Sequence, residues 1–174
     1  MSYEYVYTYD PVATGAAVGL GIGVILFSLF FSLAMYAVMS IFLGMLFKKA
    51  GVAFWKAWVP IYNMVKFFQL GGQNPLYLLF LLLPFVGEIV VVIFACMAAF
   101  NIGKKLGKPG AGWVVLYFFV NIVWYGINGL DKSVWNEALG ARSLAPETAN
   151  LAQAQAAAQS NYPPQSPVQA PPVV

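Results

Sequence analysis

The sequence predicts an all-α integral membrane protein with about four membrane-inserted helices. Of its 174 residues, 61% are hydrophobic and only 9% are charged, against roughly a quarter charged in an ordinary soluble domain. The basic residues stand in short clusters between long apolar runs, which is typical of loops held at an anionic membrane leaflet. The bilayer is therefore the solvent that this chain suits, and we expect lipid as its first partner.

Composition also excludes several classes of function. Histidine is absent and Cys96 is the single cysteine, so Ser-His and Cys-His nucleophiles, multi-cysteine metal sites and an intramolecular disulfide are not available. The basic clusters lack the density that binding a nucleic-acid backbone needs. No phosphate-binding loop or other catalytic set is present. We expect no enzyme activity, no cofactor and no nucleic-acid partner.

The first membrane helix is expected at residues 15–47, after a polar and aromatic lead at residues 1–12. No charge interrupts Ala13 to Phe47, a run longer than the roughly 20 residues that cross a hydrocarbon core. Lys48 and Lys49 end the run, whereas the lead is acidic, so the amino terminus is predicted to lie outside and the lysines inside a cell (inner) membrane. Gly15, Gly19 and Gly23 form a small-residue face. This face predicts helix–helix contact, either within the monomer or with a second copy.

Residues 52–70 break the apolar pattern and predict an amphipathic segment lying at the cytoplasmic interface. Aromatic side chains alternate there with lysines, and Pro60 is suited to opening a short helix. The candidate residues of this block are Trp55, Lys56, Trp58, Tyr62 and Asn63. A helix that binds a protein partner is the alternative interpretation.

Two interpretations fit residues 75–103. A single kinked span would carry Lys104, Lys105 and Lys108 to the outside, whereas a hairpin turning near Pro84 to Glu88 returns them to the cytoplasm. We favour the hairpin, with membrane segments at 75–84 and 85–103, because it places more basic residues inside and puts Glu88 at a helix amino terminus. The first limb is short enough to be re-entrant.

A last span is expected at residues 112–130, and the multi-pass domain then covers residues 13–136. Asn101, Asn121 and Asn128 are candidates for bonds between helices or for lining a polar cavity. Glu88, an acidic residue within the apolar body, is a candidate for capping a helix or for handling protons or cations. The Ala-, Gln- and Pro-rich residues 137–174 predict a disordered tail, with a helical stretch around residues 151–159.

Several motifs together resemble a bacterial family of small multi-pass membrane proteins catalogued as a domain of unknown function, number 5684. The resemblance covers roughly residues 15–136, and its most specific element is the block from Trp55 to Asn63. The other elements are Lys49-Ala50-Gly51, Leu70-Gly71-Gly72, Leu83-Pro84-Phe85-Val86, Asn101 to Lys108, and Asp131-Lys132-Ser133-Val134-Trp135.

The resemblance implies the membrane fold and no activity. Members are sometimes labelled signal peptidase I, an enzyme similar to a membrane anchor followed by a catalytic domain rich in β-structure. The residues after Trp135 do not predict such a domain, so the label should not be transferred. We expect a non-enzymatic scaffold or accessory subunit that contacts other membrane proteins or itself. The alternative is a small oligomeric transporter or channel that uses Glu88 and the membrane asparagines.

Overall fold

The computed structural model describes residues 11–160, and every regular element within them is a helix. The all-α prediction is therefore confirmed for these residues. The chain divides into two compact units, Met1–Val38 and Met39–Val174. In chain order the elements are α1 (Pro11–Lys49), η1 (Phe54–Trp58), α2 (Tyr62–Leu70), η2 (Pro75–Leu82), α3 (Val86–Lys105), α4 (Ala111–Phe119), α5 (Asn121–Leu130), η3 (Glu137–Leu139) and α6 (Glu147–Ser160).

Two of these helices are long and apolar enough to cross a membrane. They are residues Gly15–Lys49 of α1 and Val86–Lys105, which is α3, and they match the spans predicted at 15–47 and 85–103. In the first unit the apolar side chains of α1 are exposed all around the helix, as Phe27, Phe30 and Leu33 illustrate. A helix that is apolar on every side suits lipid rather than water. The predicted lead at residues 1–12 lies almost wholly outside the described residues.

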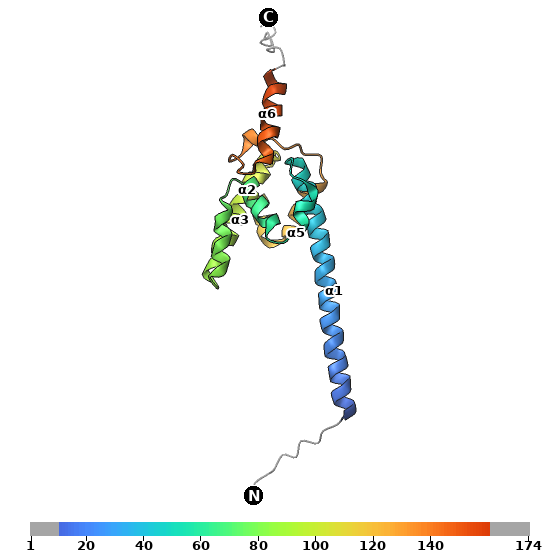
Figure 1. The fold of residues 1–174 in the computed structure, drawn as a ribbon. Coiled ribbons are helices and arrows are strands. Elements are labelled where there is room, and N and C mark those ends of the chain that lie inside the picture. The colour runs from blue at the N-terminus through green and yellow to red at the C-terminus, as the bar shows by residue number, and fades with distance from the viewer. Residues whose placement is uncertain (1–10, 161–174) are drawn as a thin grey trace, which may run out of the picture. The chain divides into compact units, whose positions relative to one another are not determined.

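The chain reverses between η2 and α3, as the hairpin interpretation predicted. The ring of Tyr77 in η2 stacks on that of Phe94 in α3 with centroids 3.9 Å apart, so the two limbs run side by side (Figure 1). However, η2 is a 3₁₀ helix of eight residues, which reaches only about 16 Å at about 2 Å per residue. It is therefore too short to cross a hydrocarbon core of about 30 Å.

Helices α2 and α3 begin with the same strained turn. Pro60 and Pro84 each precede a residue with positive φ, Ile61 at 64° and Phe85 at 63°. The next amide donates back to the proline carbonyl, at 2.6 Å for Tyr62 and 2.8 Å for Val86. This three-residue geometry is the rare γ-turn with positive φ. It lets the chain change direction abruptly and enter a helix at the next residue.

The stretch predicted as one span at 112–130 forms two helices, because the helix breaks at Val120. The backbone of Val120 has φ −140° and ψ 65°, which separates α4 from α5. In a straight helix the residues 117 and 124 would be about 10 Å apart along the axis. The break instead brings the rings of Tyr117 and Trp124 to 5.4 Å. Phe67 of α2 contacts both rings, so this aromatic cluster is the physical reason for the break.

The two ends of the α4–α5 pair meet. Lys108 precedes α4 and Asp131 follows α5, and their side chains form an ion pair. A continuous helix between them would hold them about 35 Å apart. Helices α4 and α5 therefore form a second hairpin, whose two ends meet at the Lys108–Asp131 ion pair.

Part of the predicted disordered tail is ordered. Residues 137–160 form η3, a connecting segment and α6, and α6 covers the stretch where a helix was predicted. Trp135 is buried, the amide of Leu144 donates to the carbonyl of Gln69 at 2.8 Å, and Ser143 and Ala145 are also buried. The segment is ordered because these residues pack against the core and bond to the end of α2. Residues 161–174 of the predicted tail lie outside the described part of the chain.

Close packing of α2 on α3 predicts that Gly71→Ala will be destabilising. A Cβ at Gly71 would overlap the backbone of Ala98, which is fully buried. Overpacking of this kind costs about 1–3 kcal/mol. Unfolding of the purified chain in detergent micelles, followed by circular dichroism, measures the change.

Gly112→Ala in α4 is the matched control, because a Cβ there meets no atom within 4 Å. Its helix propensity alone should leave stability unchanged or raised by up to about 1 kcal/mol. Equal stability of the two variants would contradict the close approach of α2 and α3.

Candidate functional site

Five lysines and three carboxylates form a polar layer in the second unit. Lys49 and Lys105 end α1 and α3, while the other three lysines come from η1, from within α2 and from the turn before α4. The carboxylates come from the segment that follows α5. We call this set the lysine–carboxylate layer: Lys49, Lys56, Lys66, Lys105 and Lys108 with Asp131, Glu137 and Glu147. It joins the carboxyl ends of α1, α2, α3 and α5 to the chain that leaves the helical bundle.

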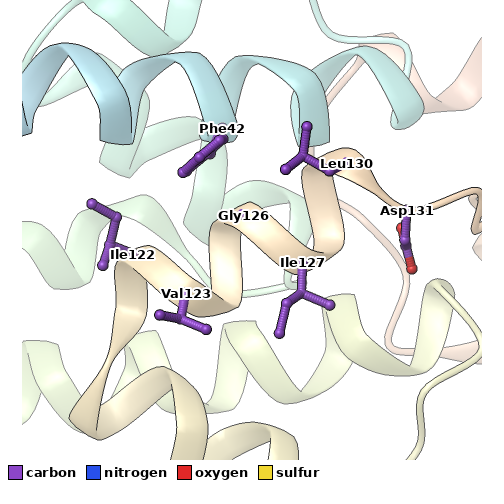
Figure 2. A pocket seen from close by; sticks show the side chains of 7 residues that line it. All are labelled: Phe42, Ile122, Val123, Gly126, Ile127, Leu130 and Asp131. Atoms are coloured by element: carbon purple, nitrogen blue, oxygen red, sulfur yellow. The ribbon is translucent and has the colours of Figure 1, made fainter.

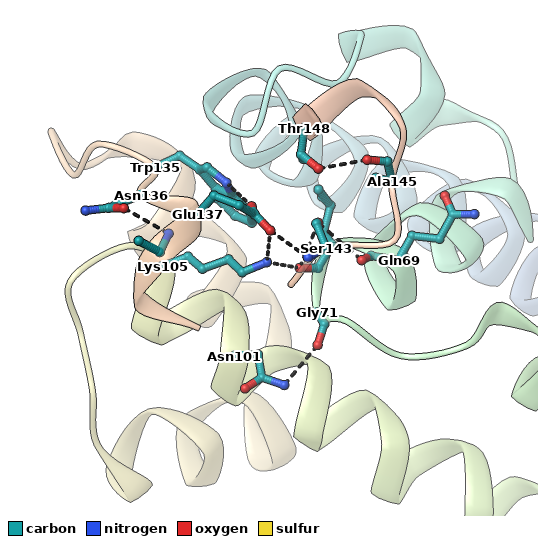
Figure 3. A network of polar contacts seen from close by, with 12 residues as sticks. Gln69, Gly71, Asn101, Lys105, Trp135, Asn136, Glu137, Ser143, Ala145 and Thr148 are labelled. Atoms are coloured by element: carbon teal, nitrogen blue, oxygen red, sulfur yellow. Dashed lines mark hydrogen bonds and ion pairs between the residues drawn. The ribbon is translucent and has the colours of Figure 1, made fainter. Parts of the chain in front are cut away.

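Lys105 is the centre of the layer. It lies in the last turn of α3, its side chain is 0% exposed, and its Nζ is 2.8 Å from Oε1 of Glu137. The same Nζ donates to the carbonyl of Leu70, the last residue of α2, at 2.9 Å. A cation at a helix carboxyl end is favourable because the carbonyls there carry partial negative charge. Lys105 therefore fastens two helices to the returning segment (Figure 3).

Both carboxylate oxygens of Glu137 accept hydrogen bonds. Its Oε1 accepts from the amide of Ser143 at 2.6 Å and its Oε2 accepts from the indole of Trp135 at 2.9 Å. The ring of Trp135 also lies 5.2 Å from the Nζ of Lys105. These contacts, drawn in Figure 3, satisfy the carboxylate as a buried ion pair requires.

Asp131 joins α1 to the α4–α5 hairpin. Lys49 donates to its Oδ1 at 2.5 Å and to the carbonyls of Asn128 and Asp131 at 2.7 Å each, so one lysine both pairs a carboxylate and caps α5. Lys108 binds the other oxygen of Asp131. Burial alone would raise the pKa of Asp131, but hydrogen bonds from Lys108, Lys49 and Ser133 outweigh it and hold the pKa below its usual value.

Glu147 bridges two lysines at the start of α6. Its Oε1 lies 2.5 Å from Lys56 Nζ and 2.9 Å from Lys66 Nζ. Burial would raise the pKa of Glu147, yet the hydrogen bonds from Lys56 and Lys66 prevail and lower it to about 2. The bond to Glu147 in turn raises the pKa of Lys56. Both partners stay charged at neutral pH.

The predicted aromatic block folds onto itself. The rings of Trp55 and Tyr62 stack with centroids 6.4 Å apart. The side-chain amide of Asn63 donates to the carbonyl of Ala57 at 3.1 Å. Lys56 lies beside both rings. The interfacial position predicted for residues 52–70 stays a prediction, and in the structure the carboxyl-terminal half of α2 is buried in the core. Its exposed apolar edge consists of Trp55, Trp58, Val59, Ile61 and Met64.

The candidate asparagines have separate roles. Asn101 on α3 donates to the carbonyl of Gly71 at 2.9 Å, which is a bond between helices. Asn128 is buried, donates to the carbonyl of Trp124 and accepts from Lys108 at 2.9 Å. Asn121 is exposed at the start of α5. The three do not meet in one polar cavity.

Glu88 lies in the first turn of α3, where the hairpin prediction placed it, and it is exposed. Glu88 is 17 residues before Lys105 in α3, so about 25 Å of helix separates it from the lysines at the other end. A Cβ built at Gly15, Gly19 or Gly23 would meet no atom within 4 Å. Their predicted role in helix–helix contact stays a prediction.

An apolar groove of about 680 Å³ lies along α5. Phe42 of α1 lines it together with Ile122, Val123, Gly126, Ile127 and Leu130 of α5 (Figure 2). Asp131 is the polar residue that lines the groove, and its side chain is already paired with two lysines. The groove therefore suits an apolar chain rather than a polar substrate.

Sequence reasoning missed the partners of the lysines. It treated them as a solvated charge on one side of a membrane and did not pair them with Asp131, Glu137 and Glu147. A signal was present, because these three acidic residues follow the last apolar run while most lysines precede it. Within the described residues, no three His, Cys, Asp or Glu side chains come together as a metal site.

Comparison with protein families gives one match. Residues 55–138 match the model of a family of unknown function, DUF5684, which is the family that the motifs resembled. The matched region contains four lysines of the layer together with Asp131 and Glu137, whereas Glu147 lies beyond its end. Neither the curated proteins nor the solved structures include a match to this chain.

Removing one partner of the central ion pair is predicted to be costly. Glu137→Gln leaves a fully buried ammonium group without its counter-ion, and such a loss destabilises by about 3–5 kcal/mol. Lys105→Met with Glu137→Gln removes both charges and should cost less than the sum of the two single changes. The free energy of unfolding in detergent micelles gives the coupling.

Lys132→Met is the charge control, since Lys132 is exposed and its loss should change stability by less than about 0.5 kcal/mol. Strict additivity of the two layer substitutions would show that Lys105 and Glu137 do not depend on each other.

Proposed function

We propose that this chain, a member of the family of unknown function DUF5684 through residues 55–138, is a multi-pass membrane protein that acts as a non-enzymatic scaffold or accessory subunit. The observation that carries the proposal is the exposed apolar edge of the aromatic block, held by a fully ion-paired layer. Trp55 is 60% exposed and Ile61 72% exposed, although their backbone is anchored through Tyr62 and Lys56. An exposed apolar surface on a well-ordered support is typical of an interaction site.

The proposed topology follows from where the helices end. α1 and α3 both finish in the lysine–carboxylate layer, so both run in the same direction across the bilayer. The chain returns between them through η2 together with the non-helical residues 71–74 and 83–85 that flank it. The concentration of lysines supports a cytoplasmic position for the layer and an outside position for the amino terminus. The segment after Asp131 belongs to the same layer, which puts the carboxyl-terminal region inside.

The membrane depth that each hairpin would reach agrees with the polarity of the residues at its tip. α4 and α5 have nine and ten residues, or about 15 Å each, which reaches the middle of the hydrocarbon core. Their tip is mainly apolar, with Phe118 and Phe119 exposed beside the polar side chain of Asn121. α3 is long enough to reach the far headgroups, and Glu88 stands near its tip. The apolar and charged tips thus match the depths that the helix lengths give them.

The alternative, a small oligomeric transporter or channel using Glu88 and membrane asparagines, draws less support. The amide groups of Asn101 and Asn128 are occupied by Gly71 and by Trp124 and Lys108. A polar path from Glu88 to Asn128 would also have to follow most of α3.

Cysteine labelling in a Cys96→Ala background tests the topology. Single cysteines at positions 110 and 132 flank the α4–α5 hairpin and should both react from the cytoplasmic side only. A cysteine at 119 should be protected from both sides, and one at 88 should react from outside. Labelling of 110 and 132 from opposite sides would restore a single span at 112–130 and contradict the second hairpin.

Photo-crosslinking in cells tests the scaffold function. A photoreactive phenylalanine analogue at Met64, on the exposed edge, should give one reproducible protein adduct of discrete mass. The matched control is the same group at Leu144, which is also exposed but lies on the returning segment, and it should not give this adduct. A protein that forms no adduct at 64 and purifies from mild detergent as a monomer alone is not a scaffold.

A further inference from the structure

We propose that Lys56 and Lys66 form a binding site for the phosphate group of an anionic phospholipid, and that Glu147 occupies this site from within the chain. The inference goes beyond the scaffold function and does not depend on it. It rests on the geometry of the two lysines, on the position of Glu147 outside the matched domain, and on the weak attachment of α6.

The two ammonium groups converge on one oxyanion. Lys56 on η1 and Lys66 on α2 approach from either side of the turn at Ile61, and both reach Oε1 of Glu147, at 2.5 and 2.9 Å. Lys66 lies 3.1 Å from Oε2 as well. Lysine binds phosphate as a point charge, so the arrangement that holds a carboxylate also suits a phosphate.

Lys66 requires an anion at this position. Its side chain is only 6% exposed, and a buried cation without a counter-ion is strongly unfavourable. Among the described residues, Glu147 is the carboxylate that reaches Lys56 and Lys66. The matched domain ends at residue 138, so the domain supplies both cations and a segment outside it supplies the anion. A carboxylate on such a segment acts as an internal ligand.

α6 is attached weakly enough to leave. Apart from Glu147 and the buried Thr148, its contacts include Leu151 beside Gly51 and a bond from Gln155 to the carbonyl of Trp135 at 2.6 Å. Most of its Ala and Gln side chains are exposed. Elements with so little burial open locally at a small fraction of the global free energy of unfolding.

A lipid is the favoured source of the phosphate, because the site adjoins the exposed apolar edge. Trp55 stacks on Tyr62, and the Tyr62 ring lies 5.9 Å from Lys56 Nζ and 5.5 Å from Lys66 Nζ. Tryptophan and tyrosine side chains favour the headgroup level of a bilayer. The same residues that seat the block at the membrane would thus present its two lysines to lipid phosphates.

Calorimetric titration of the full chain in non-ionic detergent micelles tests the proposal. Phosphatidylglycerol is the probe, with phosphatidylcholine and inorganic phosphate titrated separately. Glu147→Gln removes the internal ligand and should bind phosphatidylglycerol about tenfold tighter than the unmodified chain, because the competent state is no longer blocked. Adding Lys66→Gln to that variant should abolish the gain.

A second variant guards against loss of the fold. Leu151→Ala with Gln155→Ala keeps every charge and loosens α6, so it should bind phosphatidylglycerol more tightly than the unmodified chain and less tightly than Glu147→Gln. The proposal is overturned if neither variant gains affinity, or if the gain survives Lys66→Gln. An equal gain for inorganic phosphate would overturn the assignment to a lipid, and an equal gain for phosphatidylcholine would overturn the dependence on charge.

Discussion

The fold depends on neutralising the lysines that end its helices. Lys105 is fully buried at the carboxyl end of α3, and a bundle with that charge unpaired would not be stable. The chain meets this constraint by returning after α5 and supplying Glu137, while Asp131 and Glu147 do the same for the surrounding lysines. The segment from Asp131 to Ala145 is therefore part of the core architecture, although its sequence is polar.

Local signals in the sequence were sufficient for part of this structure. The uncharged run before Lys48 and the apolar run after Glu88 predict the two long helices, because length and composition alone decide whether a helix suits a bilayer. Pro60 and Pro84 mark the turns that open α2 and α3. The choice of a hairpin near Pro84 also came from local charge, since only a reversal returns Lys104 and Lys105 to the side of Lys49.

The remainder of the structure is set by contacts between distant residues. Nothing around Val120 resembles a helix breaker, and the break becomes favourable only when Tyr117 and Trp124 pack on Phe67 of α2. In the same way, the composition of residues 137–160 is that of a disordered tail. Glu137 and Glu147 order part of this segment through lysines far away in the sequence. Periodicity and composition describe neighbouring residues, so they cannot predict ion pairs and ring contacts between distant parts of the chain.

The break at Val120 is also compatible with the membrane depth that we propose for it. Irregular backbone in hydrocarbon is tolerated only where its polar groups are bonded internally. The amide of Val120 donates to Leu116, and the carbonyl of Val120 accepts from Val123 and Trp124, so both of its backbone groups are satisfied within the hairpin. The exposed surface of the tip is then mainly the apolar side chains of Phe118 and Phe119, with Asn121 beside them. Because the backbone of Val120 is bonded in this way, the break itself can lie within a bilayer, and the chain returns to the lysines that need its carboxylates.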